Sequence, residues 1–494
     1  MKLLFKQILS VAFLGVLFSS CKKHLLDINV DPNNPTTASA SPDLVLPAAL
    51  NNTAVIYNNP SADSRFAFAG IWMGQIAYSG NYAISTESLS YALTTNFAAA
   101  AFANIYDNIE DYDFVETKGA AAGNKFYQGI GMLMKAYNFQ TLVDLYNNVP
   151  YTEALQGTAN SKPAYDDAKA IYDDLGKKID AATDLFNASV TGSISGDIMF
   201  GGDRDKWVAF ANTVKLRLLL RQSQRGDRAS YITAEATKLN GASFLATDAT
   251  INPGYLNSAG KANPFWGANI NTSGTYTNDF YRAGQYAVQF YLDHNDPRVG
   301  RYFKPAASTG LYHGNYFGDQ GDPNSKTSEY GAGLLKAFSQ PAILMLASES
   351  YFIQAEAALK GWITVAGQTP KTLYQKGVEK SFTFLGLTAA QASTYYTQAG
   401  DKQVNWDATT NAQEQLALII RQKWAAETAI NELEPYNDYR RLTLPADVPL
   451  SLSPFSTGIF PKRLLYPQRE YEVNGENVLA QGTITPSSKV WWLP

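Results

Sequence analysis

The sequence predicts an all-α protein built from tetratricopeptide-like helical pairs with long irregular loops between them. Apolar residues recur with the 3.6-residue period of a buried helix face at 126–137, 207–218, 344–358 and 416–424. Helical stretches also lie in adjacent pairs, such as about 95–117 with 122–146, although no literal tetratricopeptide repeat is present. The fold class therefore depends on helical pairing and spacing.

The N-terminus has the layout of a secretory signal. Lys2 and Lys6 precede an apolar run at 8–18, and two serines then lead to Cys21. The run is shorter than the roughly 20 apolar residues that a transmembrane helix needs. We expect residues 1–20 to be a signal peptide that is removed.

Cys21 is the only cysteine of the chain, and it follows the small residues at the expected cleavage point. The string "LFSSC" resembles a bacterial lipobox, so we expect Cys21 to carry acyl chains that hold the protein at a membrane surface. The alternative is a leftover thiol in an ordinary signal peptide. Residues 21–43 are rich in Asp, Asn, Pro, Thr and Ser and read as a tether, which leaves 44–494 as a single domain.

Two segments, at about 241–277 and 304–338, consist of Gly, Asn, Ser and Thr with interspersed aromatic residues. Loops of this length are unusual in compact domains unless they have a function, so they are candidates for a binding surface. The net charge is −4 and no basic tract is present, which argues against nucleic-acid binding. Charged residues make up only 17% of the chain and aromatics 13%, a composition suited to neutral polar ligands.

Catalytic and metal-binding motifs are absent from the sequence. It contains three scattered histidines, no HExxH spacing, no G-x-S-x-G elbow and no phosphate loop, so we expect neither a metal site nor a cofactor. A glycosidase needs only two carboxylates, and the densest acidic group is on the 95–117 helix. We interpret this group, and the turn-type Asp203 and Asp296, as structural. The acidic residues are Asp107, Glu110, Asp111 and Asp113.

From "DLYNNVPYTEAL" onward the sequence resembles the SusD/RagB family of nutrient-binding outer-membrane lipoproteins. Further matches follow in the expected order and cover essentially the whole chain. They include "GGDRDKWVAFANTVKLRLLLR", "NDPR", "ESYFIQAEAALKG", "IIRQKW", "YNDYRR", "PKRLLYPQREYEVN" and the terminal "KVWW". In "YNDYRR" the paired arginines can hydrogen-bond carboxylates or helix C-terminal carbonyls.

The resemblance implies a SusD-like fold, in which four tetratricopeptide-like pairs form a superhelical scaffold for ligand-binding loops. It implies a lipid-anchored protein on the cell surface that is not an enzyme. Its expected partner is a SusC-like TonB-dependent transporter of the outer membrane, and its expected ligand is an oligosaccharide or, in some members, a peptide. A surface glycoside hydrolase and a purely adhesive surface protein are the alternatives.

Ligand-binding candidates combine aromatic rings, on which the C–H faces of sugars stack, with amides that pair with hydroxyl groups. "IWMGQIAYSGNYA" lies where related proteins carry a stacking aromatic, and the two long loops provide the rest. For each of these residues burial in the core is an equally good interpretation. The candidates are Trp72, Gln75, Tyr78, Asn81, Tyr82, Trp266, Asn269, Tyr276, Tyr312, Asn315 and Tyr316.

Overall fold

The computed structural model describes residues 40–58, 66–83, 85–189 and 194–494. The expected signal peptide, Cys21 and nearly all of the expected tether lie outside these residues. Within the described ranges, no helix is long and apolar enough to span a membrane.

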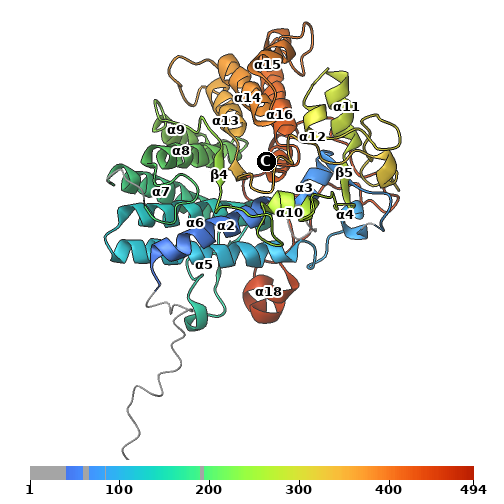
Figure 1. The fold of residues 1–494 in the computed structure, drawn as a ribbon. Coiled ribbons are helices and arrows are strands. Elements are labelled where there is room, and N and C mark those ends of the chain that lie inside the picture. The colour runs from blue at the N-terminus through green and yellow to red at the C-terminus, as the bar shows by residue number, and fades with distance from the viewer. Residues whose placement is uncertain (1–39, 59–65, 84, 190–193) are drawn as a thin grey trace, which may run out of the picture.

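The N-terminal half of the protein is a layer of long helices, coloured blue to green in Figure 1. Helix α5 folds back onto α6 through a short connection, and α6, α7 and α8 then pack against one another in chain order. A Cβ atom at Gly131 of α6 would lie 2.5 Å from the backbone nitrogen of Glu116, so only glycine permits this close approach of α5 and α6. The helices are α2 (Pro42–Asn58), α5 (Ala99–Ala121), α6 (Lys125–Tyr146), α7 (Ala168–Asn187), α8 (Arg204–Arg221) and α9 (Ala229–Thr237).

A second set of helices, orange to red in Figure 1, follows the long loops. Helix α13 packs against α14, α16 and α8, and α17 packs against α16 and α3. The contacts therefore give four consecutive pairs, α5 with α6, α7 with α8, α13 with α14 and α16 with α17, which confirms the all-α scaffold. The bounds are α13 (Ala347–Leu359), α14 (Pro370–Phe384), α15 (Ala389–Tyr396), α16 (Ala412–Ala426) and α17 (Leu433–Leu442).

Short elements make up the remainder. The short helices are α3 (Ala67–Trp72), α4 (Thr86–Ser90), α10 (Pro264–Asn269), α11 (Gln285–Asp293), α12 (Val299–Tyr302), α18 (Gln468–Val473) and α19 (Gly475–Leu479). Three two-stranded antiparallel sheets join β1 (Ile76–Tyr78) to β5 (Tyr281–Ala283), β2 (Val149–Pro150) to β3 (Tyr165–Asp166), and β4 (Ala249–Ile251) to β6 (Ala342–Met345). The β1–β5 and β4–β6 sheets fasten segments that are distant in the sequence, whereas β2 and β3 are separated only by residues 151–164.

The centre of the scaffold is polar as well as apolar. Helices α6 and α8 are buried on nearly all sides, so their charged residues must find partners inside the protein. Arg221 of α8 contacts Asp144 of α6 at 3.0 Å and Glu434 of α17 at 2.6 Å. Arg441 forms the expected bidentate contact, with Glu356 at 2.5 and 2.8 Å.

Local expectations are mostly confirmed. Asp203 caps α8, since its carboxylate accepts the backbone N–H groups of Asp205 and Lys206. Asp296 is structural, because it is fully buried in an ion pair with Arg298. One assignment was wrong: Leu344 belongs to strand β6, and the helix begins only at Ala347.

Candidate ligand-binding site

The short sheet of β1 and β5 anchors the loops in which candidate residues lie. Tyr78 pairs with Tyr281 at the end of β1, and the chain then turns outward through Asn81 and Tyr82. This sheet and α4 lie on the right of Figure 1, among the irregular segments. The first candidate segment is therefore fixed at its base and exposed at its tip.

Asn315 is buried and fastens a second loop to the same place. Its side-chain amide donates to the carbonyl oxygens of Tyr78 at 2.9 Å and Asp322 at 3.0 Å, and its Oδ1 accepts the backbone N–H of Asp322 at 2.7 Å. Asn81 closes the arrangement by accepting the backbone N–H of Asn324 at 3.3 Å. Asn315 therefore positions the loop that carries Tyr316.

Three of the candidate residues are exposed on these tied loops, and we call them the loop face: Asn81, Tyr82 and Tyr316. The side chains of Tyr82 and Tyr316 are 44% and 51% exposed. The ring of Tyr82 packs edge-on against Phe280, with centroids 5.6 Å apart. This contact limits the freedom of the Tyr82 ring before any ligand arrives.

Other candidates are buried. The Trp72 ring stacks on Phe97 at a centroid distance of 5.7 Å, and its indole N–H donates to the carbonyl of Ser88. It has no exposed surface, so it has no face free for a ligand. The other buried candidates are Gln75, Tyr78, Asn269 and Asn315, each of which hydrogen-bonds within the protein.

Two tyrosines, Tyr276 and Tyr312, are half-buried. The guanidinium of Arg282 lies 5.8 Å from the Tyr276 ring centroid, and burial raises the pKa of the Tyr276 hydroxyl. The hydroxyl of Tyr312 packs against Gly300, where a Cβ atom would lie 2.8 Å away. Both tyrosine side chains therefore make contacts within the protein.

Trp266 of α10 is also half-buried, but it faces a cavity of about 890 Å³. The cavity lies between α2 and residues 253–272, and we call it the α2–α10 cavity. The sequence indicated the loop and Trp266, but it gave no sign that Asn51 of α2 would complete the wall. That contribution comes from a helix far away in the chain and becomes visible only in the fold.

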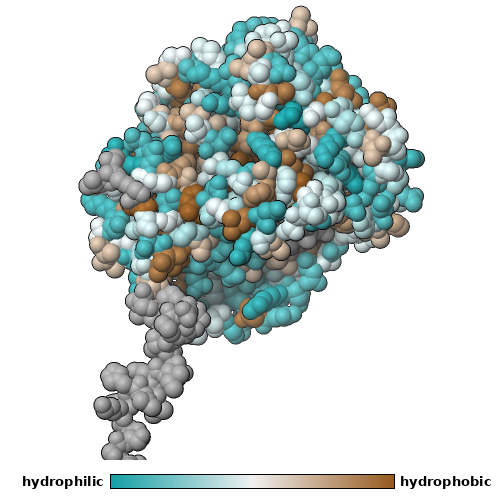
Figure 2. Space-filling view, in the orientation of Figure 1, coloured by the Kyte–Doolittle hydropathy of each residue, from teal (hydrophilic) through white to brown (hydrophobic). Residues whose placement is uncertain are grey.

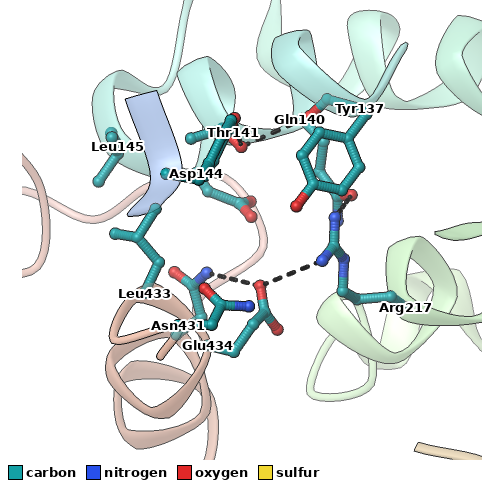
Figure 3. A pocket seen from close by; sticks show the side chains of 11 residues that line it. Tyr137, Gln140, Thr141, Asp144, Leu145, Arg217, Asn431, Leu433 and Glu434 are labelled. Carbon is teal, nitrogen blue, oxygen red and sulfur yellow. Dashed lines mark hydrogen bonds and ion pairs between the residues drawn. The ribbon is translucent and has the colours of Figure 1, made fainter. Parts of the chain in front are cut away.

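A separate pocket lies in the polar centre of the scaffold. Figure 3 shows Tyr137, Arg217 and Glu434 pointing toward one another from α6, α8 and α17. Burial would raise the pKa of Glu434, but Arg221, Arg217 and Lys423 outweigh that effect and hold it below its usual range. The pocket has a volume of about 10 Å³, the space of one water molecule, and therefore cannot hold a sugar ring.

Acidic side chains are the other groups that the sequence singled out. Among the residues described, no three His, Cys, Asp or Glu side chains gather in a way that could hold a metal ion. On the densest acidic stretch, Asp107 and Glu110 are exposed, and Asp113 pairs with Lys135 at 2.6 Å. Asp111 is half-buried and accepts a hydrogen bond from Asn52, so the solvated helix face that the sequence indicated is found at Asp107 and Glu110 but not at Asp111.

A helical-repeat scaffold that presents exposed aromatic residues on fastened loops is an arrangement suited to binding a ligand. A family model described as "Starch-binding associating with outer membrane", the SusD-like family, matches residues 32–467. The chain belongs to this family. It is accordingly an outer-membrane nutrient-binding protein and has no enzymatic activity.

Solved structures share the fold. An outer-membrane protein of Bacteroides vulgatus, for which nutrient binding is suggested, matches with a TM-score of 0.74 and 22% identity over 92% of this chain and 100% of that chain. A SusD homologue of Bacteroides fragilis gives 0.75 and 19% over 92% and 100%. A chitin-binding SusD homologue of Flavobacterium johnsoniae gives 0.74 and 21% over 91% and 98%. None of the curated proteins searched matches the sequence.

Proposed function

We propose that the protein binds nutrient oligosaccharides at the cell surface through the loop face and delivers them to a SusC-like TonB-dependent transporter. Cys21 carries the lipid that anchors it in the outer membrane. The observation that carries the proposal is the exposure of Tyr82 and Tyr316 on loops that Asn315 fastens to one sheet. Membership of a nutrient-binding outer-membrane family supports the same role.

The chemistry of the loop face suits a sugar. The flat C–H surface of a pyranose ring stacks on an aromatic side chain, and its hydroxyl groups need polar partners nearby. Tyr82 and Tyr316 provide two rings with hydroxyl groups. Asn81 provides a side-chain amide whose oxygen accepts the backbone N–H of Asn324 and whose nitrogen makes no hydrogen bond with the described residues. The chitin-binding relative makes chitin oligosaccharides a reasonable first member of a test panel.

Binding of soluble oligosaccharides and peptides, measured by calorimetry, tests the proposal. We expect a saccharide to bind, and Tyr82→Ala and Tyr316→Ala each to weaken it by about threefold to tenfold, the value of one aromatic stacking contact. Phe114→Ala, which removes a half-buried ring from the distant helix α5, is the control. Unchanged binding in both tyrosine variants would remove the loop face from the proposal, and binding of peptides alone would replace the sugar by a peptide.

The transport half of the proposal has its own experiment. Gentle extraction of the tagged full chain from its native outer membrane should bring a TonB-dependent barrel with it. A purely adhesive protein would be recovered without one, and this outcome would overturn the delivery role while leaving the ligand measurements intact.

A further inference from the structure

The α2–α10 cavity is a second concave surface that the loop face does not include. Its wall consists of Asn51 and Val55 from α2 and the segment 253–272, in which α10 lies. Figure 1 places α2 and α10 next to each other at the front of the molecule. With about 890 Å³, the cavity falls within the range of about 300–1,000 Å³ that small-molecule sites occupy.

Hydrogen bonds hold the walls of the cavity in place. The Tyr255 hydroxyl donates to Oδ1 of Asn51 at 3.3 Å, which joins the loop to α2. The side-chain amide of Asn257 donates to the carbonyl of Thr272 at 3.2 Å, which joins the two ends of the loop. Asn263 caps α10 and also donates to the carbonyl of Gln340. The cavity is therefore formed before a ligand binds.

The lining combines an aromatic ring with amides. Trp266 is half-buried, and its indole N–H makes no hydrogen bond with any residue that the structure describes. Asn257 and Asn271 add amide groups, while Val55 and Ile270 add apolar surface. Figure 2 shows the same mixture of hydrophilic, neutral and hydrophobic residues over this face of the molecule.

The lining of the cavity carries positive charge and no negative charge. Lys261 is its single ionisable side chain apart from the tyrosine, and no carboxylate lines the cavity. Lys261 is exposed and forms no ion pair with the described part of the chain. An anionic group on a ligand would meet an unpaired cation and no like charge.

We propose that the α2–α10 cavity is a second saccharide site, which takes a short oligosaccharide bearing a carboxylate, such as a uronic acid. One sugar ring lies on Trp266, the indole N–H and the asparagine amides bind its hydroxyl groups, and the carboxylate pairs with Lys261. The choice of a saccharide depends on the proposed function, whereas the location and the preference for an acid depend on the cavity alone.

The probes are trimers of galacturonate, glucuronate and mannuronate, each compared with its neutral carboxyl-reduced counterpart. We expect at least one acid to bind the full chain more tightly than its neutral form, by about fivefold for one exposed ionic contact. The difference should shrink as salt is added, because salt screens exposed charges. Failure of all three acids to bind would overturn the proposal.

Three variants locate the binding. Lys261→Met should remove the preference for the acid and leave the neutral form unchanged. Trp266→Ala should weaken the binding of both forms at the cavity by about threefold to tenfold, the value of one aromatic stacking contact. Gly267→Phe provides a second route to the same result, because a Cβ at Gly267 meets only the Ala262 Cβ at 3.7 Å, so the ring can fill the cavity without disturbing the wall.

The loop face serves as the control. Tyr82→Ala and Tyr316→Ala should leave acid binding unchanged, since they lie outside the cavity lining. Loss of acid binding in these two variants but not in Gly267→Phe would place the acid on the loop face and overturn the second site. Acid binding that is retained while Tyr82→Ala and Tyr316→Ala also leave the binding of neutral oligosaccharides unchanged would overturn the loop face alone.

Discussion

At the scale of single residues, Glu432 places a carboxyl group in the buried seam between α17 and α3. Its side chain is 7% exposed and packs against Gly70. Burial raises the pKa of Glu432 from 4.5 to about 7. The unfolded chain therefore loses this proton at lower pH than the folded chain does, and stability declines as pH rises between those two values.

Glu432→Gln tests this effect, because glutamine keeps the shape of the neutral acid but cannot ionise. The variant should match the wild type below pH 4.5 and exceed its unfolding free energy above pH 7 by about 3 kcal/mol. Urea unfolding at the two ends of this range measures the difference. Glu476→Gln, at an exposed position, controls for the loss of a carboxylate, and an equal change at both ends for Glu432→Gln would contradict the argument.

At the scale of elements, α8 begins where Asp203 accepts two backbone N–H groups at its N-terminus. Helix α8 packs against α7, α6 and α13, so a change at its first turn reaches both halves of the scaffold. Asp203→Ala should lower the unfolding free energy by about 1 kcal/mol, the usual value of an N-cap. Asp107→Ala, on an exposed face of α5, should change it by less than about 0.5 kcal/mol. Equal effects of the two substitutions would mean that the cap contributes nothing.

The helices could be predicted because the apolar residues that become buried recur with helical spacing in the local sequence. Residues 126–137, 207–218 and 416–424 all lie in the expected helices α6, α8 and α16. Leu344 fits the same spacing, but it lies in β6, which pairs with a strand almost a hundred residues earlier, and local periodicity carries no information about such a pairing. The resemblance of the whole chain to one family supplied the architecture of the pairs.

The candidate site could be predicted only in part. An aromatic residue beside an amide has the same local pattern whether it is exposed, as Tyr82 is, or enclosed, as Trp72 is. Tertiary contacts separate them: Phe97 and Tyr436 pack against the fully buried Trp72, whereas Tyr82 packs against Phe280 and stays exposed. The α2–α10 cavity could not be predicted from local sequence either, because two segments that are distant in the sequence form its wall.

At the scale of the whole molecule, the end of the chain closes the scaffold. Trp492 is fully buried, and its indole N–H donates to Asp144 of α6 at 2.7 Å. Asp144 in turn contacts Arg221 of α8, and Arg221 contacts Glu434 of α17. The C-terminal residues therefore join helices from both halves of the protein.

Trp492→Ala should destabilise the protein by about 3–5 kcal/mol, because it removes a large buried ring and leaves part of the network without its donor. Trp492→Phe keeps most of the apolar surface and should cost less, about 1–3 kcal/mol, mainly through the lost hydrogen bond to a buried carboxylate that Arg221 and Tyr172 still contact. Chemical unfolding of both variants measures how much the buried ring and the hydrogen bond to Asp144 each contribute to the unfolding free energy. A smaller loss for alanine than for phenylalanine would exclude the ring as the main contributor.

The attachment of the exposed loops to the β1–β5 sheet also bears on the kinetics of capture. Because Asn315 and the strand pairing hold the loops in position, association does not wait for a loop to order. The observed association rate should then rise in proportion to ligand concentration, and differences among ligands should appear in how long each stays bound. For a protein that captures dilute nutrients in this way, diffusion limits the association rate, and the residence time of the bound ligand sets the affinity.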